Sequence, residues 1–565
     1  MSRARVPEKL CERGISRRDF LKLGGAGLAG AAMLGVAGCG SVFEGGGEGG
    51  NGGNGGGGDN ALNFNVGAEI PDMDPSTSTD AASADVIGNI YDTLYKLDND
   101  LVPVPSLAES HEESEDGLTY TFTLREGIQW SNGDPVTSQD FKYSWLRAMN
   151  PDTASQYAYI IADYVENGTE FSAGDVPEEE VGIETPDDRT LVVNLSRPVP
   201  YYLSLVAFKT YVPLNRAFIE EQGGDFAQGA DSMLYCGPYV LTEFNPSSGG
   251  RLEKNPDYWD ADNVALEAVN LEVVTDQNTA LNLYEAGELD LVALTAENVT
   301  RFEDSPELYE YTEFVSWYLT FNMVEDEAMQ NVNVRRAISR AVDKEALVDQ
   351  ILRNGSTPGV GFVPPGMAGV TPEEPFREFA GDIAPEFNPE EARRFWEQGV
   401  EDLGQAPTLS LLSQDSSTAQ DLATFLQAQL QENLGAEVEV DAQPFEAFLD
   451  RIDQQDYQFT NQGWIADYND PSNFLDLWLS DGSYNRSGYV NEEYDQLLQS
   501  TTETNDNEAR MEAFAEAEQI LLGDDPACSP LYFGGVIGLK KPYVERPDPP
   551  PFGAVDFTTY SLEEE

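Results

Sequence analysis

Histidine, cysteine and positive charge are scarce in this chain. One His, at position 111, and four Cys occur among 565 residues. A metal centre built from histidines and nucleophilic catalysis that depends on a histidine base are therefore excluded. The 32 Lys and Arg residues stand against 101 Asp and Glu residues, which gives a formal net charge of −69. Nucleic-acid binding is excluded as well, because no domain-sized basic surface can form to contact phosphates.

Motifs typical of enzymes are also missing. The sequence contains no Gly-Lys dipeptide for a phosphate-binding loop, no HExxH pattern and no GxSxG pattern. We therefore expect no catalytic residues, no cofactor and no metal site. A surface glycoside hydrolase stays open as the enzymatic alternative, since two carboxylates suffice for that reaction and acidic residues are abundant.

The apolar residues that are present are sufficient for a large buried core. Hydrophobic residues make up 40% of the chain and aromatic residues 10%, and the length suggests two to four domains. The carboxylates are spread along the whole sequence rather than gathered in a tail. At molar salt the Debye length falls to about 3 Å, which suppresses the repulsion among them. We therefore predict that the chain comes from an extreme halophile.

The N-terminal segment resembles an export signal. Arg17 and Arg18 stand side by side in Ser-Arg-Arg-Asp-Phe-Leu-Lys, and a weakly apolar Gly/Ala/Leu run follows at 23–37. This order is typical of a twin-arginine signal. The run ends in Val-Ala-Gly-Cys, which looks like a lipoprotein box with Cys39 as the lipidated residue. We predict a signal at 1–38.

A glycine-rich tether follows the predicted lipidation site. Eleven of the fourteen residues 45–58 are Gly, a composition that loses too much backbone entropy to form a packed element. Residues 39–60 would behave as a flexible chain that reaches roughly 25 Å. We therefore expect an exported protein, held by a lipid at the outer face of the cytoplasmic membrane.

Beyond the tether the hydrophobic pattern indicates both α and β structure. The segments 118–124 and 190–195 alternate with the period of a strand. Residues 422–434 carry apolar side chains at helical spacing, stop at Gly435 and lead into a short strand pattern at 438–440. A similar helical pattern runs over 334–352. Antiparallel strands together with helix-to-strand units favour several α/β lobes over a barrel.

A series of short motifs resembles one protein family, and the motifs occur here in the same order as in that family. The motifs are Leu107-Ala108-Glu109-Ser110, Asp116–Phe122, Leu124–Gly127, Trp130–Thr137 with Asp140-Phe141, Cys236–Tyr239, Lys254–Trp259, Phe321-Asn322, Val334–Ile338 with Asp343, and Gly463–Pro471. Together they are similar to the extracytoplasmic oligopeptide- and dipeptide-binding proteins of ABC transporters, solute-binding protein family 5. The resemblance covers the chain from about Ala61 to its last residues.

This resemblance implies a fold and a function. The fold is the α/β type II periplasmic-binding-protein fold, with two hinged lobes and the extra lobe of the peptide-binding family. The function is capture of a peptide between lobes I and III and its delivery to the permease subunits of an ABC importer. The implied limits are 61–98, 212–315 and 534–565 for lobe I, 99–211 for lobe II, and 316–533 for lobe III.

The resemblance also assigns candidate ligand-binding residues. A binder of many peptides has to use what all peptides share, which is the main chain and the charged ends. The family places the carboxylate for the terminal ammonium in a Trp-x-Ala-Asp-Tyr motif, which corresponds here to Asp467 between Trp464 and Tyr468. Tyr157, Trp317 and Phe445 are further candidates for the cleft wall, although each of these aromatic residues could equally belong to the core.

Departures from the family pattern leave the ligand open. Asn461 and Ile452 stand where better-known oligopeptide binders carry Arg for the far, carboxylate end of the peptide. The same fold could therefore bind an oligosaccharide or another small solute. Cys236 and Cys528 could form a disulfide or stay reduced, because their separation in sequence says nothing of their distance. His111 is interpreted as a structural residue.

Overall fold

The computed structural model of the protein describes residues 60–99, 101–324, 326–371, 374–482, 484–504, 506–546 and 551–563. These residues belong to the unit Gly56–Glu565. The predicted export signal with Arg17 and Arg18, the lipidation site Cys39 and residues 39–59 of the tether lie outside the described residues. They stay predictions.

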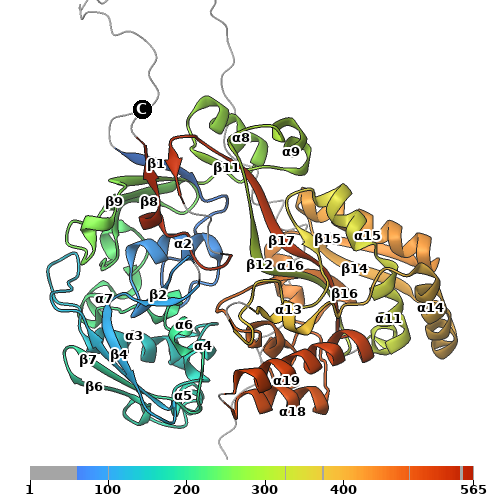
Figure 1. Ribbon diagram of the computed structural model, residues 1–565, viewed down its shortest axis with the longest axis horizontal. Coiled ribbons are helices and arrows are strands. Elements are labelled where there is room, and N and C mark those ends of the chain that lie inside the picture. The colour runs from blue at the N-terminus through green and yellow to red at the C-terminus, as the bar shows by residue number, and fades with distance from the viewer. Residues whose placement is uncertain are drawn as a thin grey trace, which may run out of the picture. The chain divides into compact units, whose positions relative to one another are not determined.

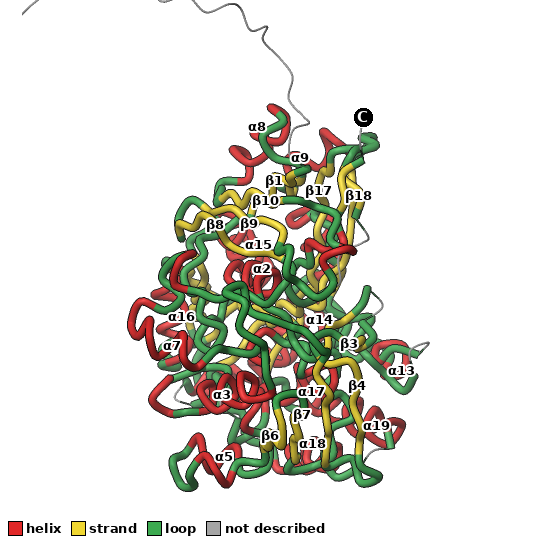
Figure 2. Tube along the Cα trace, turned by 90° about the vertical axis from the view of Figure 1, so that its left-hand side faces the viewer, coloured by secondary structure: helices red, strands yellow, loops and turns green. Residues whose placement is uncertain are grey.

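The first sheet joins the beginning of the described chain to strands from its middle. Its order is β1-β10-β9-β8, with β1 parallel to β10 and the other neighbours antiparallel. Figure 1 labels β1, β8 and β9, and Figure 2 labels all four strands. The strands are β1 (Ala61–Asn65), β8 (Tyr239–Asn245), β9 (Gly249–Lys254) and β10 (Ala268–Glu272). Helix α2 (Ala81–Ile90) lies against β8. It begins after Asp80, whose carboxylate accepts a hydrogen bond from the Ser83 backbone N–H.

The second sheet is antiparallel throughout and has the order β4-β5-β7-β6. Its strands are β4 (Ala108–Glu113), β5 (Thr119–Leu124), β6 (Ile183–Asp187) and β7 (Thr190–Asn194), of which β4, β6 and β7 are labelled side by side in Figure 2. Both alternating segments of the sequence are thereby confirmed as strands. In β5 every second side chain is buried, because one face of the sheet packs under helix α3 (Ser138–Met149), which contacts β6 and β7.

The third sheet is the largest and has the order β11-β17-β12-β16-β14-β15, with the short strand β13 paired to β17. The two pairs that contain β14 are parallel and the others are antiparallel. The strands are β11 (Leu291–Ala293), β12 (Leu308–Phe321), β13 (Thr357–Pro358), β14 (Thr408–Gln414), β15 (Glu437–Gln443), β16 (Phe459–Ile465) and β17 (Cys528–Lys540). The chain is therefore an α/β protein with mixed sheets, as the pattern predicts.

One helix-to-strand unit is confirmed and one predicted helix is divided. Helix α15 (Ser417–Leu434) ends at Gly435, which has the left-handed φ of 71°, and leads directly into β15. The helical pattern at 334–352 instead forms α11 (Val332–Ala341), α12 (Lys344–Ala346) and a π-helical turn. The division occurs because the Asp343 carboxylate accepts a hydrogen bond from the Ala346 N–H and so starts a new helix.

The buried side chains form separate cores. One continuous cluster includes Leu62 of the first sheet and Phe122 of the second, so these two sheets share a core. The third sheet contributes mainly to other clusters, one of which contains Leu411 and Phe459, although Leu291 of β11 belongs to the first cluster. Most of the third sheet therefore packs around cores of its own.

The predicted lobe limits stay a prediction. The limit at 315/316 falls inside β12, and the limit at 533/534 falls inside β17. Both strands thus pass from one predicted lobe to the next. Their pairing has an irregularity between Thr312 and Ser316, next to the first limit. An irregularity of this kind bends a strand locally.

Three smaller observations concern the remaining sequence features. Cys236 and Cys528 are buried and free, so they are not joined by a disulfide. The ring Nδ1 of His111 lies 2.7 Å from the hydroxyl of Tyr95, at a position on β4. Within the described residues, no helix has the length and hydropathy needed to span a bilayer.

Candidate ligand-binding cleft

A cavity of about 710 Å³, here called the cleft, contains the main candidate residue, Asp467. Its lining comes from α2 and the residues after it, from the segment 156–212, from the end of β16 with the loop that follows, and from residues 552–559. Its volume falls in the usual range for sites that enclose a small molecule, which is about 300–1,000 Å³.

Asp467 lies in the loop directly after β16 and points its carboxylate at two tyrosines. Oδ1 accepts a hydrogen bond from the Tyr157 hydroxyl at 3.2 Å, and Oδ2 accepts one from the Tyr159 hydroxyl at 3.4 Å. The Asp467 backbone N–H donates to Asn473 Oδ1 at 3.1 Å. Both side-chain partners are neutral, so no cation lies within ion-pair distance of this carboxylate among the described residues.

The electrostatic state of Asp467 follows from this environment. Burial raises its pKa from 3.8 to about 6, while Asn473, Tyr157, the Lys209 ammonium and Tyr159 act in the opposite direction. Asp467 is therefore ionised at neutral pH, although its charge is costly there. A ligand cation would remove this cost by supplying the missing partner.

The backbone just before Asp467 has an open edge. Strand β16 pairs along its whole length with β12 on one side. On its other side β14 reaches only Phe459 and Thr460. Among the described residues no strand covers that edge at Gly463, Trp464 and Ile465, all of which line the cleft. Their main-chain N–H and C=O groups can therefore pair with an extended ligand.

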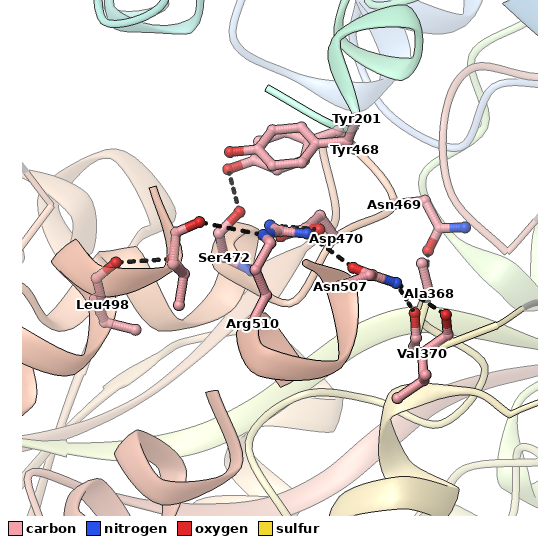
Figure 3. A network of polar contacts seen from close by, with 12 residues as sticks. Tyr201, Ala368, Val370, Tyr468, Asn469, Asp470, Ser472, Leu498, Asn507 and Arg510 are labelled. Atoms are coloured by element: carbon pink, nitrogen blue, oxygen red, sulfur yellow. Dashed lines mark hydrogen bonds and ion pairs between the residues drawn. The ribbon is translucent and has the colours of Figure 1, made fainter. Parts of the chain in front are cut away.

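The aromatic neighbours of Asp467 lie in different places. Trp464 lines the cleft and donates through Nε1 to Asn473 Oδ1 at 3.0 Å. Tyr468 does not line the cleft. Its buried ring stacks on Tyr201 with centroids 5.0 Å apart and an angle of 4° between the planes, which is visible in Figure 3. Tyr468 therefore supports the loop from behind.

A polar network holds the loop after Asp467 in place (Figure 3). The Asp470 carboxylate accepts two hydrogen bonds of 2.9 Å from one guanidinium nitrogen of Arg510. The Asn469 side chain accepts a hydrogen bond from the Ala368 N–H at 2.8 Å. Asn507, three residues before Arg510, donates to the carbonyls of residues 369 and 370. Asn469 and Asp470 thus connect this loop to Ala368 and Arg510, and these contacts hold Asp467 in position.

The other predicted residues are placed as follows. Tyr157 lines the cleft and contacts Asp467. Trp317 lies behind Gly463, where a Cβ on that glycine would come within 2.9 Å of its ring, and it is not part of the cleft lining. Phe445 is the first residue of α16 (Phe445–Asp453), and its side chain lies outside the described part of the structure. One turn later, Leu449 of the same helix lines the cleft.

Four residues near Asp467 escape the sequence reasoning. Tyr159 contacts Asp467, and Lys209, Tyr484 and Arg486 line the cleft. The Tyr-Ala-Tyr spacing was an available signal for Tyr159. For Lys209 the signal was scarcity, because the whole chain contains nine Lys and a lysine beside apolar residues is conspicuous in so acidic a sequence.

Comparison with known proteins places the chain in a family. Residues 102–486 match the description "Bacterial extracellular solute-binding proteins, family 5 Middle". The chain belongs to this solute-binding family. Within family 5, the oligopeptide-binding protein OppA of Bacillus subtilis is 33% identical over 84% of this chain and 87% of its own length. The dipeptide-binding protein DppE of the same organism is 32% identical over 95% of this chain and 98% of its own length.

A solved structure gives the same family 5 assignment. Listeria monocytogenes OppA bound to peptide matches with a TM-score of 0.81 and 36% identity, over 90% of this chain and 100% of that chain. The predicted family and the type II periplasmic-binding-protein fold are thereby confirmed. Family 5 consists of extracellular solute-binding proteins rather than enzymes. Among the residues that the structure describes, no group of three or more His, Cys, Asp or Glu could hold a metal ion.

Proposed function

We propose that this family 5 protein captures peptides in the cleft and delivers them to an ABC importer. The observation that carries the proposal is the position of Asp467, a half-buried carboxylate without a cationic partner at the end of the open β16 edge. A peptide has an ammonium at one end and main-chain donors and acceptors along its length. Both features fit this arrangement.

The proposed roles of the residues follow from their positions. Asp467 binds the peptide's terminal ammonium, and the edge of Gly463 and Ile465 pairs with its main chain. Trp464 and Tyr157 form the wall next to the first peptide residue. Tyr468 and Trp317 support this wall from behind, and Phe445 belongs to the helix that borders the far part of the cleft.

The proposed partners and location come from the same reasoning. OppA and DppE of Bacillus subtilis are named for oligopeptide and dipeptide binding, and we propose the same ligand class here, with permease subunits as the protein partners. The chain acts as a receptor and not as an enzyme. We further propose that Cys39 carries the lipid that holds it at the outer face of the membrane, after export through the signal at Arg17 and Arg18.

The test is calorimetric titration of short peptides in molar KCl. We expect Asp467→Asn to lower the affinity at least 100-fold, because about 3–5 kcal/mol is lost when one partner of a buried charge pair is removed. N-acetylated peptides should bind the unchanged protein equally poorly. Asp415→Asn is the matched control, since Asp415 is an exposed acid outside the cleft.

Two results would contradict the proposal. Equal affinity of free and acetylated peptides would mean that Asp467 does not bind an ammonium. Binding of oligosaccharides without any binding of peptides would assign the cleft to the alternative ligand class.

A further inference from the structure

Three basic side chains line the cleft, and one differs from the other two. Lys96 Nζ lies 3.9 Å from Asp556 Oδ2, and Arg486 lies 2.8 Å from Asp453 Oδ1. Lys209 instead donates to the Ser78 carbonyl oxygen. Within the described residues it has no carboxylate at ion-pair distance. Among the described residues that line the cleft, Lys209 is therefore the one cation without a carboxylate partner.

Lys209 is both buried and directed at the site of Asp467. Its relative exposure is 9%, and its ammonium lies 4.8 Å from the ring centroid of Tyr157. The hydroxyl of that same tyrosine donates to Asp467. The ammonium therefore lies over the Tyr157 ring while the carboxylate lies at the hydroxyl of the same side chain, and among charged groups Asp467 has the largest influence on Lys209.

The remaining acids near Lys209 are already engaged. Asp80, Asp72 and Asp74 also act on its charge, each less than Asp467 does. Asp80 caps helix α2, Asp74 forms an ion pair with Arg147 at 2.5 Å, and Asp72 accepts a hydrogen bond from Thr77 at 2.7 Å. Apart from Asp467, the carboxylates that act on this buried ammonium are thus held by other groups, and no carboxylate pairs with it directly. Such an ammonium is costly until an anion reaches it.

We infer that Lys209 receives a carboxylate of the bound ligand, so that the cleft selects peptides with a negative charge close to their N-terminal ammonium. This inference rests on the proposed function, because it takes Asp467 as the ammonium site. Two kinds of peptide carry such a carboxylate. One is a peptide with an acidic first residue, and the other is a dipeptide, whose α-carboxylate lies about one residue from its ammonium.

The charges of the site explain the selection. A ligand that brings an ammonium alone to Asp467 also brings it near the Lys209 ammonium, and like charges at short range oppose binding. A ligand that brings both charges compensates both side chains. Selectivity then arises from repulsion of the singly charged ligand as well as attraction of the matched one.

The experiment compares matched peptides by calorimetric titration in molar KCl. Glu-Ala-Ala-Ala is compared with Gln-Ala-Ala-Ala, and Ala-Ala with Ala-Ala amide, each against the unchanged protein, Lys209→Met and Lys209→Arg. Lys142→Met is the control variant, because Lys142 also donates to a carbonyl, that of Ile183 at 2.7 Å, but lies outside the cleft.

In at least one pair, we expect the unchanged protein to prefer the peptide with the additional carboxylate by tenfold or more over the partner that lacks it. Lys209→Met should abolish that preference while the partner without the additional carboxylate still binds, and Lys209→Arg should keep the preference. The pair that shows the preference identifies the source of the carboxylate. Lys142→Met should change neither the preference nor the affinity for the partner peptide.

Two outcomes would overturn the inference in distinguishable ways. Peptides that bind without any charge preference, or with a preference that survives in Lys209→Met, would show that Lys209 only anchors the chain to the Ser78 carbonyl. If no peptide binds to the unchanged protein, the proposed function fails and this inference fails with it.

Discussion

At the scale of single residues, the ammonium site proposed at Asp467 would make ligand binding depend on pH. Its pKa of about 6 lies above the ordinary value of 3.8, because burial disfavours the charge. The folded protein therefore holds this proton more tightly than the unfolded chain does. Its contribution to the free energy of unfolding decreases as the pH rises from about 4 to about 6, by about 3 kcal/mol in all.

We predict that peptide affinity falls as the pH is lowered through 6. Only the ionised carboxylate attracts an ammonium, so the dissociation constant should increase about tenfold between pH 7 and pH 5. Titrations at several pH values measure this change. The pKa values of Asp85 and Asp476 are also raised, to about 7. The Asp467→Asn variant keeps these two acids and so separates their effect from that of Asp467. Its weak residual affinity should vary far less with pH over the same range. A similar slope in both proteins would contradict the assignment.

The sequence predicts some of these residues and not others, for a physical reason. Asp467 and Trp464 stand in a motif, so local sequence is enough to find them. The role inferred for Lys209 depends on its burial beside Tyr157, and that burial depends on contacts between segments far apart in the chain. Tyr468 belongs to the same motif as Asp467, yet its ring packs on Tyr201. A motif identifies a loop and not the direction of each side chain.

At the scale of elements, strand β16 requires glycine at one position. A Cβ on Gly463 would lie 2.9 Å from Trp317 Cδ2, and the Trp317 ring is held by stacking on Tyr532, with centroids 5.7 Å apart. We predict that Gly463→Ala lowers the free energy of unfolding by about 1–3 kcal/mol, as overpacking does, and weakens peptide binding. Gly224→Ala is the control, because nothing lies within 4 Å of its Cβ position. Equal stability of the two variants in chemical denaturation would show that the Trp317 ring can move aside at little cost in free energy.

The loop after β16 depends on one buried ion pair. Side-chain exposures are 3% for Arg510 and 5% for Asp470. We predict that Arg510→Met lowers the free energy of unfolding by about 3–5 kcal/mol, since it leaves a buried carboxylate uncompensated. Asp470→Asn combined with Arg510→Met should be less destabilising than the sum of the single variants. Denaturation curves of all three variants measure the coupling, and strict additivity would show that the two groups do not act as a pair.

Element types were easier to predict than their limits. Periodicity alone predicts the strands at 118–124 and 190–195 and the helix before Gly435. In each of these elements one face is buried, so the apolar side chains recur with the period of the element. The division of the helix at 334–352 follows from a local competition in which the Asp343 side chain caps a new turn. The lobe limits are harder still, since β12 and β17 are continuous strands across them, and no loop marks the change.

At the scale of the whole molecule, the net charge of −69 requires an explanation. The structure describes a folded protein with ordinary cores, so the carboxylates must be tolerated on its surface rather than prevent folding. We propose that screening at molar salt provides this tolerance, with a Debye length of about 3 Å against about 10 Å at 0.1 M.

We predict that the melting temperature falls markedly when KCl is lowered from molar to about 0.1 M, because repulsion among carboxylates then reaches across each lobe. The residues Glu178, Glu179 and Glu180 provide a sharper test, since all three are exposed and adjacent. Their triple replacement by Gln should raise the melting temperature at 0.1 M KCl and have little effect at molar KCl. Calorimetric scans of both proteins at both salt concentrations separate screening from other effects of salt. Equal melting temperatures at the two concentrations, or an equal effect of the triple replacement at both, would show that the acidity serves another purpose.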